Sequence, residues 1–220
     1  MSNDAFDSPT TAPLADAVRR GDVAEIRRQL EHVPADTPGS DGDTLLIDAI
    51  RQRRVASVEA LLEGGADPNR TNARGDTAVH AAAFSGDVAV LRAVLAHGGD
   101  ADARNPNTGA TPLIQAVLSP NPDQASVLLD AGADPDRADR NGETPLHVAG
   151  RTNTGAAVLA LLRAGARADA MNARGATFQA EYFSFPAPLL NARARAERHD
   201  IVAWLKANGV ALEANVAASY

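Results

Sequence analysis

Apolar residues recur along the chain with the spacing of one face of a helix, in pairs of short stretches separated by polar turns. Residues 12–20 form the first stretch, with Leu14, Ala17 and Val18 on one face, and residues 23–30 form its partner. Gly21 falls between the two stretches and marks the break. The pattern predicts an all-α chain built from pairs of short helices.

A glycine recurs with the same pattern, at Gly42, Gly75, Gly109, Gly142 and Gly175. The steps between these glycines are 33, 34, 33 and 33 residues, and a threonine stands two residues after each glycine. The single longer step comes from one extra residue in the turn that leads to Gly109. A fixed period of this length is typical of an array in which each unit buries its apolar face against its neighbours.

The repeated unit resembles a known family. GETPLHVA at 142–149 resembles the helix-opening signature of the ankyrin repeat, and GADPN at 65–69 and GADPD at 132–136 resemble its helix-closing signature. The resemblance covers residues 11–212 and implies a solenoid of about six helix–turn–helix units, joined by β-turn-like fingers. In this family, partners usually bind the concave face, which the finger tips and the exposed side of each first helix form.

The resemblance divides the chain into one repeat domain between two short tails. We expect a loose tail at residues 1–10 and a frayed end at 213–220. The first unit lacks the recurring threonine and ends in a polar loop, as expected of a capping unit whose outer side faces water. Thr44 and Thr144 are placed to cap the first helices of their units. The expected units are residues 11–39, 40–72, 73–106, 107–139, 140–172 and 173–212.

The last unit departs from the period through an aromatic insertion at residues 178–197. Phe178, Tyr182, Phe183 and Phe185 place half of the eight aromatic residues of the chain there. One interpretation is a cap, in which a loop carrying Phe183, Phe185 and Pro186 folds over the last helices and covers the exposed end of the array. The other is a recognition loop, since long irregular insertions often carry function.

The composition is that of an acidic chain without cysteine. A net charge of −7 argues against non-specific attraction to nucleic acid or anionic lipid. The absence of cysteine excludes a disulfide framework, a thiolate metal site and a cysteine nucleophile. We see neither a secretory signal nor the roughly 18 apolar residues that a spanning helix needs, so we expect a cytoplasmic protein without a membrane partner. Helical arrays have no free strand edges that demand an oligomer, so we expect a monomer. One lysine against twenty arginines indicates a GC-rich, bacterial source.

Histidines and aspartates are the obvious candidates for catalysis or metal binding. His80 and His147 hold the fourth position of the TPLH-like signature, and the resemblance implies that they make structural hydrogen bonds between adjacent turns. No two histidines stand four residues apart, so we expect no metal. Asp67, Asp100 and Asp134 recur beside glycine turns, where a short acceptor bonds local N–H groups. A catalytic pair is needed once and not in every unit, so we expect neither an enzyme nor a cofactor.

Candidate partner contacts follow from the phase of the repeat. Arginine occupies three of the five finger tips, either by chance, because tips are solvated, or as a basic stripe aimed at an acidic partner. Phe84 and Leu118 are apolar at a phase that faces out, which indicates either a binding hot spot or cover for the inter-helix loops. The candidate contacts are Arg74, Phe84, Leu118, Arg140, Arg151 and Arg174.

These observations predict a non-catalytic module that binds another protein through its concave face, as an adaptor or inhibitor. A narrower alternative is an immunity protein that neutralises a bacterial toxin, and another is a secreted effector that acts on a host. Nucleic-acid binding through the arginine finger tips is an alternative of a different class, and the acidic composition argues against it.

Overall fold

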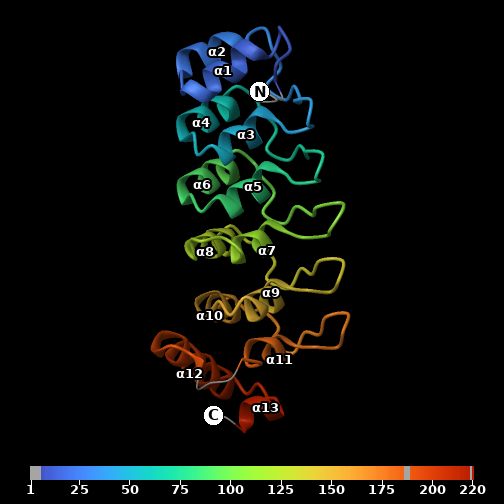
Figure 1. Cartoon of the computed structure of the whole chain (residues 1–220), viewed down its shortest axis with the longest axis vertical. Coiled ribbons are helices and arrows are strands. Elements are labelled where there is room, and N and C mark those ends of the chain that lie inside the picture. The colour runs from blue at the N-terminus through green and yellow to red at the C-terminus, as the bar shows by residue number, and fades with distance from the viewer. Residues whose placement is uncertain (1–5, 186–188, 219) are drawn as a thin grey trace.

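A computed structural model describes residues 6–185, 189–218 and 220, and it shows helix pairs stacked along one axis with fingers projecting to one side (Figure 1). The described residues form helices and no strands, with one isolated bridge between Pro38 and Thr44, so the expected all-α solenoid is confirmed. The inner helices, beside the fingers, are α1 (Ala12–Arg20), α3 (Leu45–Arg51), α5 (Ala78–Ser85), α7 (Pro112–Val117), α9 (Pro145–Arg151) and α11 (Phe178–Tyr182). The outer helices are α2 (Val23–Leu30), α4 (Val55–Glu63), α6 (Val88–Ala96), α8 (Asp123–Asp130), α10 (Gly155–Arg163) and α12 (Ala192–Ala207), and α13 (Ala214–Ala217) follows them.

The recurring threonine begins the inner helices, as its position predicts. Thr44 Oγ1 accepts a hydrogen bond from Ile47 N at 3.2 Å, and Thr144 Oγ1 accepts one from His147 N at 3.4 Å. Each bond satisfies one of the N–H groups that a helix leaves free at its first turn. Pro145 holds the first helical position of α9, where its missing N–H costs nothing.

The recurring glycine is required at the finger tips for two reasons. Gly42 and Gly142 have φ angles of 76° and 72°, in the left-handed region that disfavours side chains. A Cβ atom on Gly42 would also lie 2.8 Å from the Ala73 Cβ, and one on Gly142 would lie 2.9 Å from the Ala173 N. The next finger therefore stacks directly on the glycine, which explains why the residue returns with the repeat.

The extra residue of the fourth unit is absorbed inside its finger. Gly75 N donates to Asn72 O, three residues back, whereas Gly109 N donates to Asn105 O, four residues back, at 2.7 Å. The turn widens by one residue, and the helices on either side keep their phase.

Two buried histidines tie neighbouring repeats together, which confirms their expected structural role. The Nδ1 of His80 accepts from Thr77 N at 3.2 Å, so the neutral ring carries its proton on Nε2 and donates to Ala110 O at 3.1 Å. His147 makes the equivalent bond to Ala176 O at 3.0 Å. Burial lowers the pKa of His80, which keeps the ring in this neutral form.

Side chains in the loops that leave the outer helices form a second set of links. An aspartate or asparagine of one repeat accepts a hydrogen bond, 2.8–3.0 Å long, from a backbone N–H of the next repeat. Each bond fixes the register of two repeats. The predicted local bonds of Asp67, Asp100 and Asp134 are also present, at 2.8–2.9 Å to the N–H two residues on. We call the links between repeats the outer-loop ladder, which pairs Asp36 with Asp67, Asn69 with Asp100, Asp102 with Asp134 and Asp136 with Arg167.

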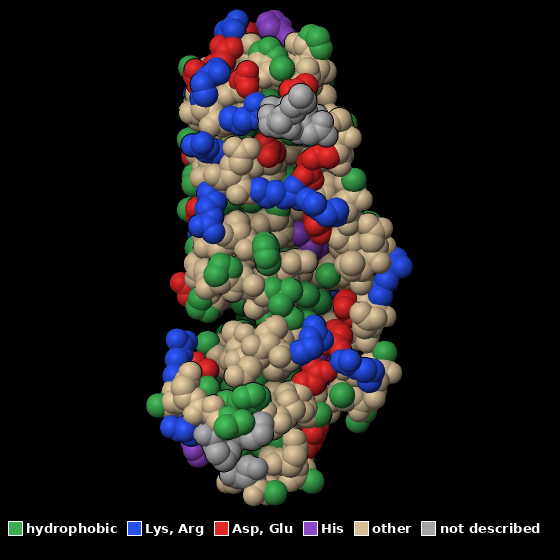
Figure 2. Space-filling view, viewed as in Figure 1, with side chains coloured by type: hydrophobic (Ala, Val, Ile, Leu, Met, Phe, Trp, Pro, Cys, Tyr) green, Lys and Arg blue, Asp and Glu red, His purple; other side chains and the backbone are tan. Residues whose placement is uncertain are grey.

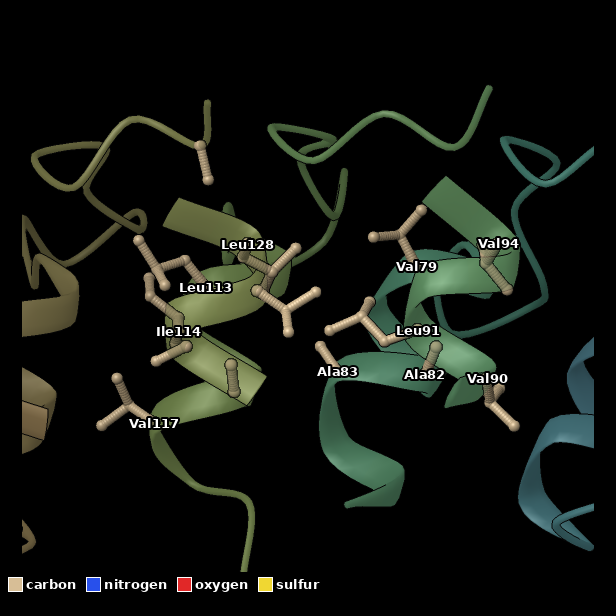
Figure 3. Close-up of a cluster of buried hydrophobic side chains, with 14 of the residues drawn as sticks. Val79, Ala82, Ala83, Val90, Leu91, Val94, Leu113, Ile114, Val117 and Leu128 are labelled. Carbon is tan, nitrogen blue, oxygen red and sulfur yellow. The ribbon is translucent and has the colours of Figure 1, made fainter. Parts of the chain in front are cut away.

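The core between repeats is aliphatic and is filled by small and medium side chains. Figure 3 shows Leu91 pointing from its repeat toward the next repeat, which carries the buried Leu113 and Leu128. Ala82 on α5 is also fully buried, and its small side chain lets neighbouring helices approach closely. Burial of apolar surface between repeats supplies most of the stability of such an array.

The C-terminal insertion differs from the expected loop, because both of its ends are helical, residues 178–182 in α11 and residues 192–197 in α12. α12 starts at Ala192 and runs for 16 residues, which makes it the longest helix of the described chain. Tyr182 and Phe183 are buried beneath it, and the guanidinium of Arg198 lies 5.4 Å from each ring centroid. Arg198 is itself buried and donates to Tyr182 O at 2.6 Å and to Phe185 O at 2.7 Å. These contacts favour the cap interpretation, although Phe185 stays exposed and Pro186 lies outside the described residues.

The described parts of the two expected tails make contacts with the array. Phe6 is buried in the core beside the first repeat, and its carbonyl accepts a hydrogen bond from Thr11 Oγ1. At the other end, α13 buries Val216, and the ring of Tyr220 packs 5.7 Å from that of Phe183. Apolar residues in both segments cover the ends of the array, which short polar tails could not do.

Candidate partner-binding surface

The predicted contact residues lie on or beside the inner helices and the fingers. Figure 2 shows that the visible face carries arginine and lysine side chains above and below a central group of hydrophobic side chains. Along the stack, this face therefore has an apolar centre between two positively charged zones.

Phe84 and Leu118 supply the apolar centre. Phe84 sits near the end of α5 and is 54% exposed, and Leu118 caps the end of α7 and is 44% exposed. Large apolar side chains with this exposure on adjacent repeats are typical of a contact surface for another molecule. The phase of the repeat predicted their exposure correctly.

The Asp43 cluster, which consists of Asp43, Arg51, Asn72 and Arg74, lies on one side of this centre. Arg51 Nη1 pairs with Asp43 Oδ2, and Arg74 Nη2 lies 3.5 Å from the same oxygen. Asn72 Nδ2 donates to the other carboxylate oxygen at 2.7 Å. One carboxylate thus holds two guanidinium groups from adjacent repeats.

The Glu143 cluster, which consists of Glu143, Arg151, Asn172 and Arg174, lies on the other side. Arg151 and Arg174 pair with the Glu143 carboxylate at 2.5 and 2.9 Å, and Asn172 Nδ2 donates to it at 3.0 Å. In both clusters the first arginine follows the acid by 8 residues, the asparagine by 29 and the second arginine by 31. The two clusters are therefore copies of one arrangement in different repeats.

In both clusters the acid is buried and the arginines above it are exposed. The side chains of Asp43 and Glu143 are 11% and 6% exposed, whereas those of Arg74 and Arg174 are 64% and 65% exposed. A partner would meet guanidinium groups held in place by carboxylates that it cannot reach. The buried acids pre-organise the arginines, which lowers the entropy that binding would cost.

The third finger-tip arginine is held differently. Arg140 Nη2 donates to Pro106 O on the preceding finger, and no ion pair of the described residues includes it. The structure thus brings Arg74 and Arg174 into acid-centred clusters and leaves Arg140 on the fingers alone. The three arginines do not form one uniform stripe.

Sequence reasoning missed several residues of this surface. Asp43 and Glu143 each stand one residue after a finger glycine, where they read as ordinary turn residues. Arg51 shares its phase with Arg151, so the phase of the repeat places it on the same side, although it is not among the candidate contacts. No group of three or more metal-binding side chains occurs among the described residues, and no helix there is long and apolar enough to cross a membrane.

Family models of the ankyrin repeat match this architecture. A model of three consecutive ankyrin repeats matches residues 58–139 and 79–172, and a model of one repeat matches residues 41–73. Together these matches span well over half of the chain. The chain is an ankyrin-repeat protein. Ankyrin-repeat proteins are generally interaction modules without catalytic activity, so the fold indicates a protein-binding function.

Individual relatives agree with this assignment. The chain is 43% identical to Protein PhlB of Serratia liquefaciens over 119 residues, which are 54% of this chain and 52% of PhlB. It is 36% identical over 87 residues to the inactive serine/threonine-protein kinase TEX14 of Bos taurus, of which the match covers 6%. The match thus spans about half of the bacterial relative and a small part of the mammalian one.

A solved structure shows the same fold over most of the chain. The ankyrin repeat domain of Bcl-3, a member of the IkappaB protein family, superposes with a TM-score of 0.76 and 26% sequence identity. The superposition covers 87% of this chain and 85% of the Bcl-3 chain. The ankyrin array therefore extends well beyond the repeats that the family models match.

Proposed function

We propose that this ankyrin-repeat protein is a non-catalytic adaptor or inhibitor that binds a protein partner on the face formed by its inner helices and fingers. The observation that carries the proposal is the exposed pair Phe84 and Leu118, flanked by the Asp43 and Glu143 clusters. Apolar side chains near the centre of a surface, with arginines around them, have the composition of an interface hot spot.

The stacked repeats support this proposal, because they hold the surface in shape before a partner arrives. The histidine bonds and the outer-loop ladder link each repeat to the next, so the positions of the arginines relative to Phe84 are set in the free protein. A preformed surface loses little conformational entropy on binding, which favours affinity for a given area.

The proposal can be tested by capture of the tagged protein from lysate of its native cell after nuclease treatment. Wild type should retain a protein that the double variant Phe84→Ser/Leu118→Ser loses. Leu189→Ser is the matched control, because Leu189 is also an exposed leucine but lies within the C-terminal insertion, away from α5 and α7 in the chain. Equal retention by wild type and the double variant would move binding to another surface, and a signal that nuclease removes would indicate nucleic acid.

The arginines provide a second, graded test of the same face. Arg74→Ala combined with Arg174→Ala should weaken capture of the partner and reduce its dependence on salt, because exposed ion pairs across an interface are screened by ions. Arg140→Ala should have the smaller effect, since its guanidinium already donates to the Pro106 carbonyl. If Arg140→Ala weakened capture more than the Arg74→Ala/Arg174→Ala variant, the result would favour a basic stripe along the finger tips over the acid-centred clusters.

A further inference from the structure

Arg53 has a backbone conformation that is unusual for arginine. Its φ angle is 55°, in the left-handed region, and it stands two residues before the outer helix α4. The same loop position is occupied by Gly21, Gly86 and Asn153, with φ angles of 71°, 79° and 54°. Glycine and asparagine tolerate this conformation, whereas a long side chain pays for it in steric repulsion.

The strained residue borders a groove. A hollow of about 380 Å³ lies beside the end of α5 and is lined by Arg51, Arg53, Ala81, Phe84, Ser85 and Pro120. We call this hollow the Phe84 groove. Residues held in rare backbone conformations tend to cluster at binding sites, where position matters more than local stability. The strain at Arg53 therefore points to a role for its side chain in this groove.

The Phe84 groove combines apolar and positively charged walls. Ala81, Phe84 and Pro120 give apolar surface, while Arg51 and Arg53 bring guanidinium groups. No acidic side chain is among the described residues that line it. The carboxylate that pairs with Arg51 is that of Asp43, which is buried beneath the arginines, outside the lining.

Arg53 keeps hydrogen-bonding capacity for a ligand. Its guanidinium donates to Ser85 O at 2.9 Å, which anchors the group beside the groove, and no ion pair of the described residues includes it. A guanidinium has five N–H donors, so most remain for an incoming acceptor. Guanidinium groups bind carboxylates in a two-pronged geometry that adds specificity as well as affinity.

We propose that the Phe84 groove recognises a segment of a protein partner in which an acidic side chain stands next to a large apolar one. The apolar side chain packs on Phe84, and the carboxylate accepts hydrogen bonds from Arg53 and Arg51. This inference rests on the proposed protein-binding function and specifies the chemistry of the partner. It assigns Arg53 as the residue that selects the acid.

The test is selection of a random library of 12-residue peptides, displayed on phage, against the full-length chain. Enriched peptides should carry Asp or Glu within two positions of Phe, Leu or Trp. For a synthetic copy of the most enriched peptide, Arg53→Gly should weaken binding at least tenfold, about 1.4 kcal/mol. The thermal stability of Arg53→Gly should not fall, because glycine relieves the backbone strain.

Asn153→Gly is the matched control, since it makes the same backbone change at an equivalent loop and Asn153 does not line the Phe84 groove. It should leave peptide affinity unchanged. Equal affinity of wild type and Arg53→Gly would overturn the assignment of Arg53. Enriched peptides that need Phe84 but lack acids would overturn the acidic preference while leaving protein binding by this face intact. No enrichment at all would overturn the inference, and the capture experiment would then judge the proposed function separately.

Discussion

The Asp43 and Glu143 clusters are built from the same positions of the repeat, but they have different surroundings. In the second, Arg174 also pairs with Glu181 of α11 at 2.8 Å. Glu181 stands six residues after Gly175, and the residue six positions after Gly75 is Ala81, which lines the Phe84 groove. A hollow lies beside each cluster, and Glu181 puts a carboxylate into one lining where Ala81 puts a methyl group into the other. We call the Glu143 cluster closed, because Glu181 also pairs with Arg174, and the Asp43 cluster open, because Ala81 offers Arg74 no second carboxylate.

The same repeat positions can thus have different surroundings, which leave one cluster available to a partner and tie the other to the last inner helix. Each cluster alone positions two arginines, and one residue on the following inner helix decides whether the hollow beside them contains a carboxylate. The C-terminal insertion holds the closed end in place, because Arg198 on α12 donates to the backbone of Tyr182 at the end of α11. The predictions below alter one cluster or its support and leave the other as a reference.

The largest effect should come from removal of the anchor of the closed end. Arg198→Ala should destabilise the C-terminal repeat by about 3 kcal/mol, because it leaves buried carbonyls without donors and opens a cavity between aromatic rings. Hydrogen exchange should accelerate in residues 178–207 and stay unchanged around Asp43. Arg195→Ala is the control, because Arg195 is an exposed arginine of the same helix that bonds the Leu190 carbonyl. Comparable losses of stability in Arg198→Ala and Arg195→Ala would mean that the burial of Arg198 does not contribute to the stability of the C-terminal repeat.

Removal of each central acid should distinguish the clusters. Asp43→Ala should cost about 2 kcal/mol, because Arg51 and Arg74 are then left together without a counter-charge. Glu143→Ala should cost about 1 kcal/mol, because Glu181 still pairs with Arg174. Urea denaturation followed by circular dichroism measures both, and high salt should narrow the difference. A greater cost at Glu143 would show that Glu181 does not compensate.

Exchange of the deciding residue should convert the open cluster into a closed one. Ala81→Glu should place a carboxylate within reach of Arg74, narrow the Phe84 groove and weaken the selected peptide about tenfold, or 1.4 kcal/mol. Glu181→Ala is the matched change in the other cluster and should leave that affinity unaltered. Because the arginine of each pair is exposed to water, which screens the pair, both variants should keep their stability within about 1 kcal/mol. Unchanged peptide affinity in Ala81→Glu would show that peptide binding in the Phe84 groove does not depend on the Asp43 cluster.

The smallest effect concerns the pH dependence of the open side, where His80 lies beside Arg74 and Phe84. Burial lowers the pKa of His80 in the folded protein, so the unfolded chain binds the proton more readily. The stabilising contribution is present above the ordinary histidine pKa of about 6.5 and is lost as pH falls through and below that value. His80→Gln should flatten this part of the stability profile, and His32→Gln, which removes an exposed ring, serves as the comparison. Identical profiles for wild type and His80→Gln would contradict the prediction.

Much of the fold could be predicted, because its signals are local and repeated. The glycine–threonine period gave the helix pairs, and the positions of Thr44 and Thr144 gave the starts of their inner helices. The beginning of α12 could not be found in this way, because a charged stretch after a proline-rich one reads as a loop. Nor could the burial of Arg198, because burial of an arginine depends on carbonyl groups supplied by a distant turn.

The candidate surface was predictable only where it depended on helix phase. Phase placed Phe84 and Leu118 on the outside, and the structure agrees. The Asp43–Arg74 contact joins residues of different repeats, so no local pattern reveals it. The conformation of Arg53 was also hidden, since only alignment of its loop with those of Gly21 and Gly86 indicates a left-handed backbone.

The outer-loop ladder has a consequence for how such a chain can change in length. Each repeat inside the ladder offers one acceptor side chain to its successor and one backbone N–H to its predecessor, and the first and last repeats of the ladder offer one of the two. Duplication or deletion of a whole unit in the gene would bring matching groups together again at the new junction. Insertion or deletion of a single residue in an outer loop would instead move the acceptor and the N–H group out of register. The single-residue insertion in the regular array lies in the finger of Gly109, where the turn can widen. The ladder thus favours changes in length by whole repeats over changes by single residues.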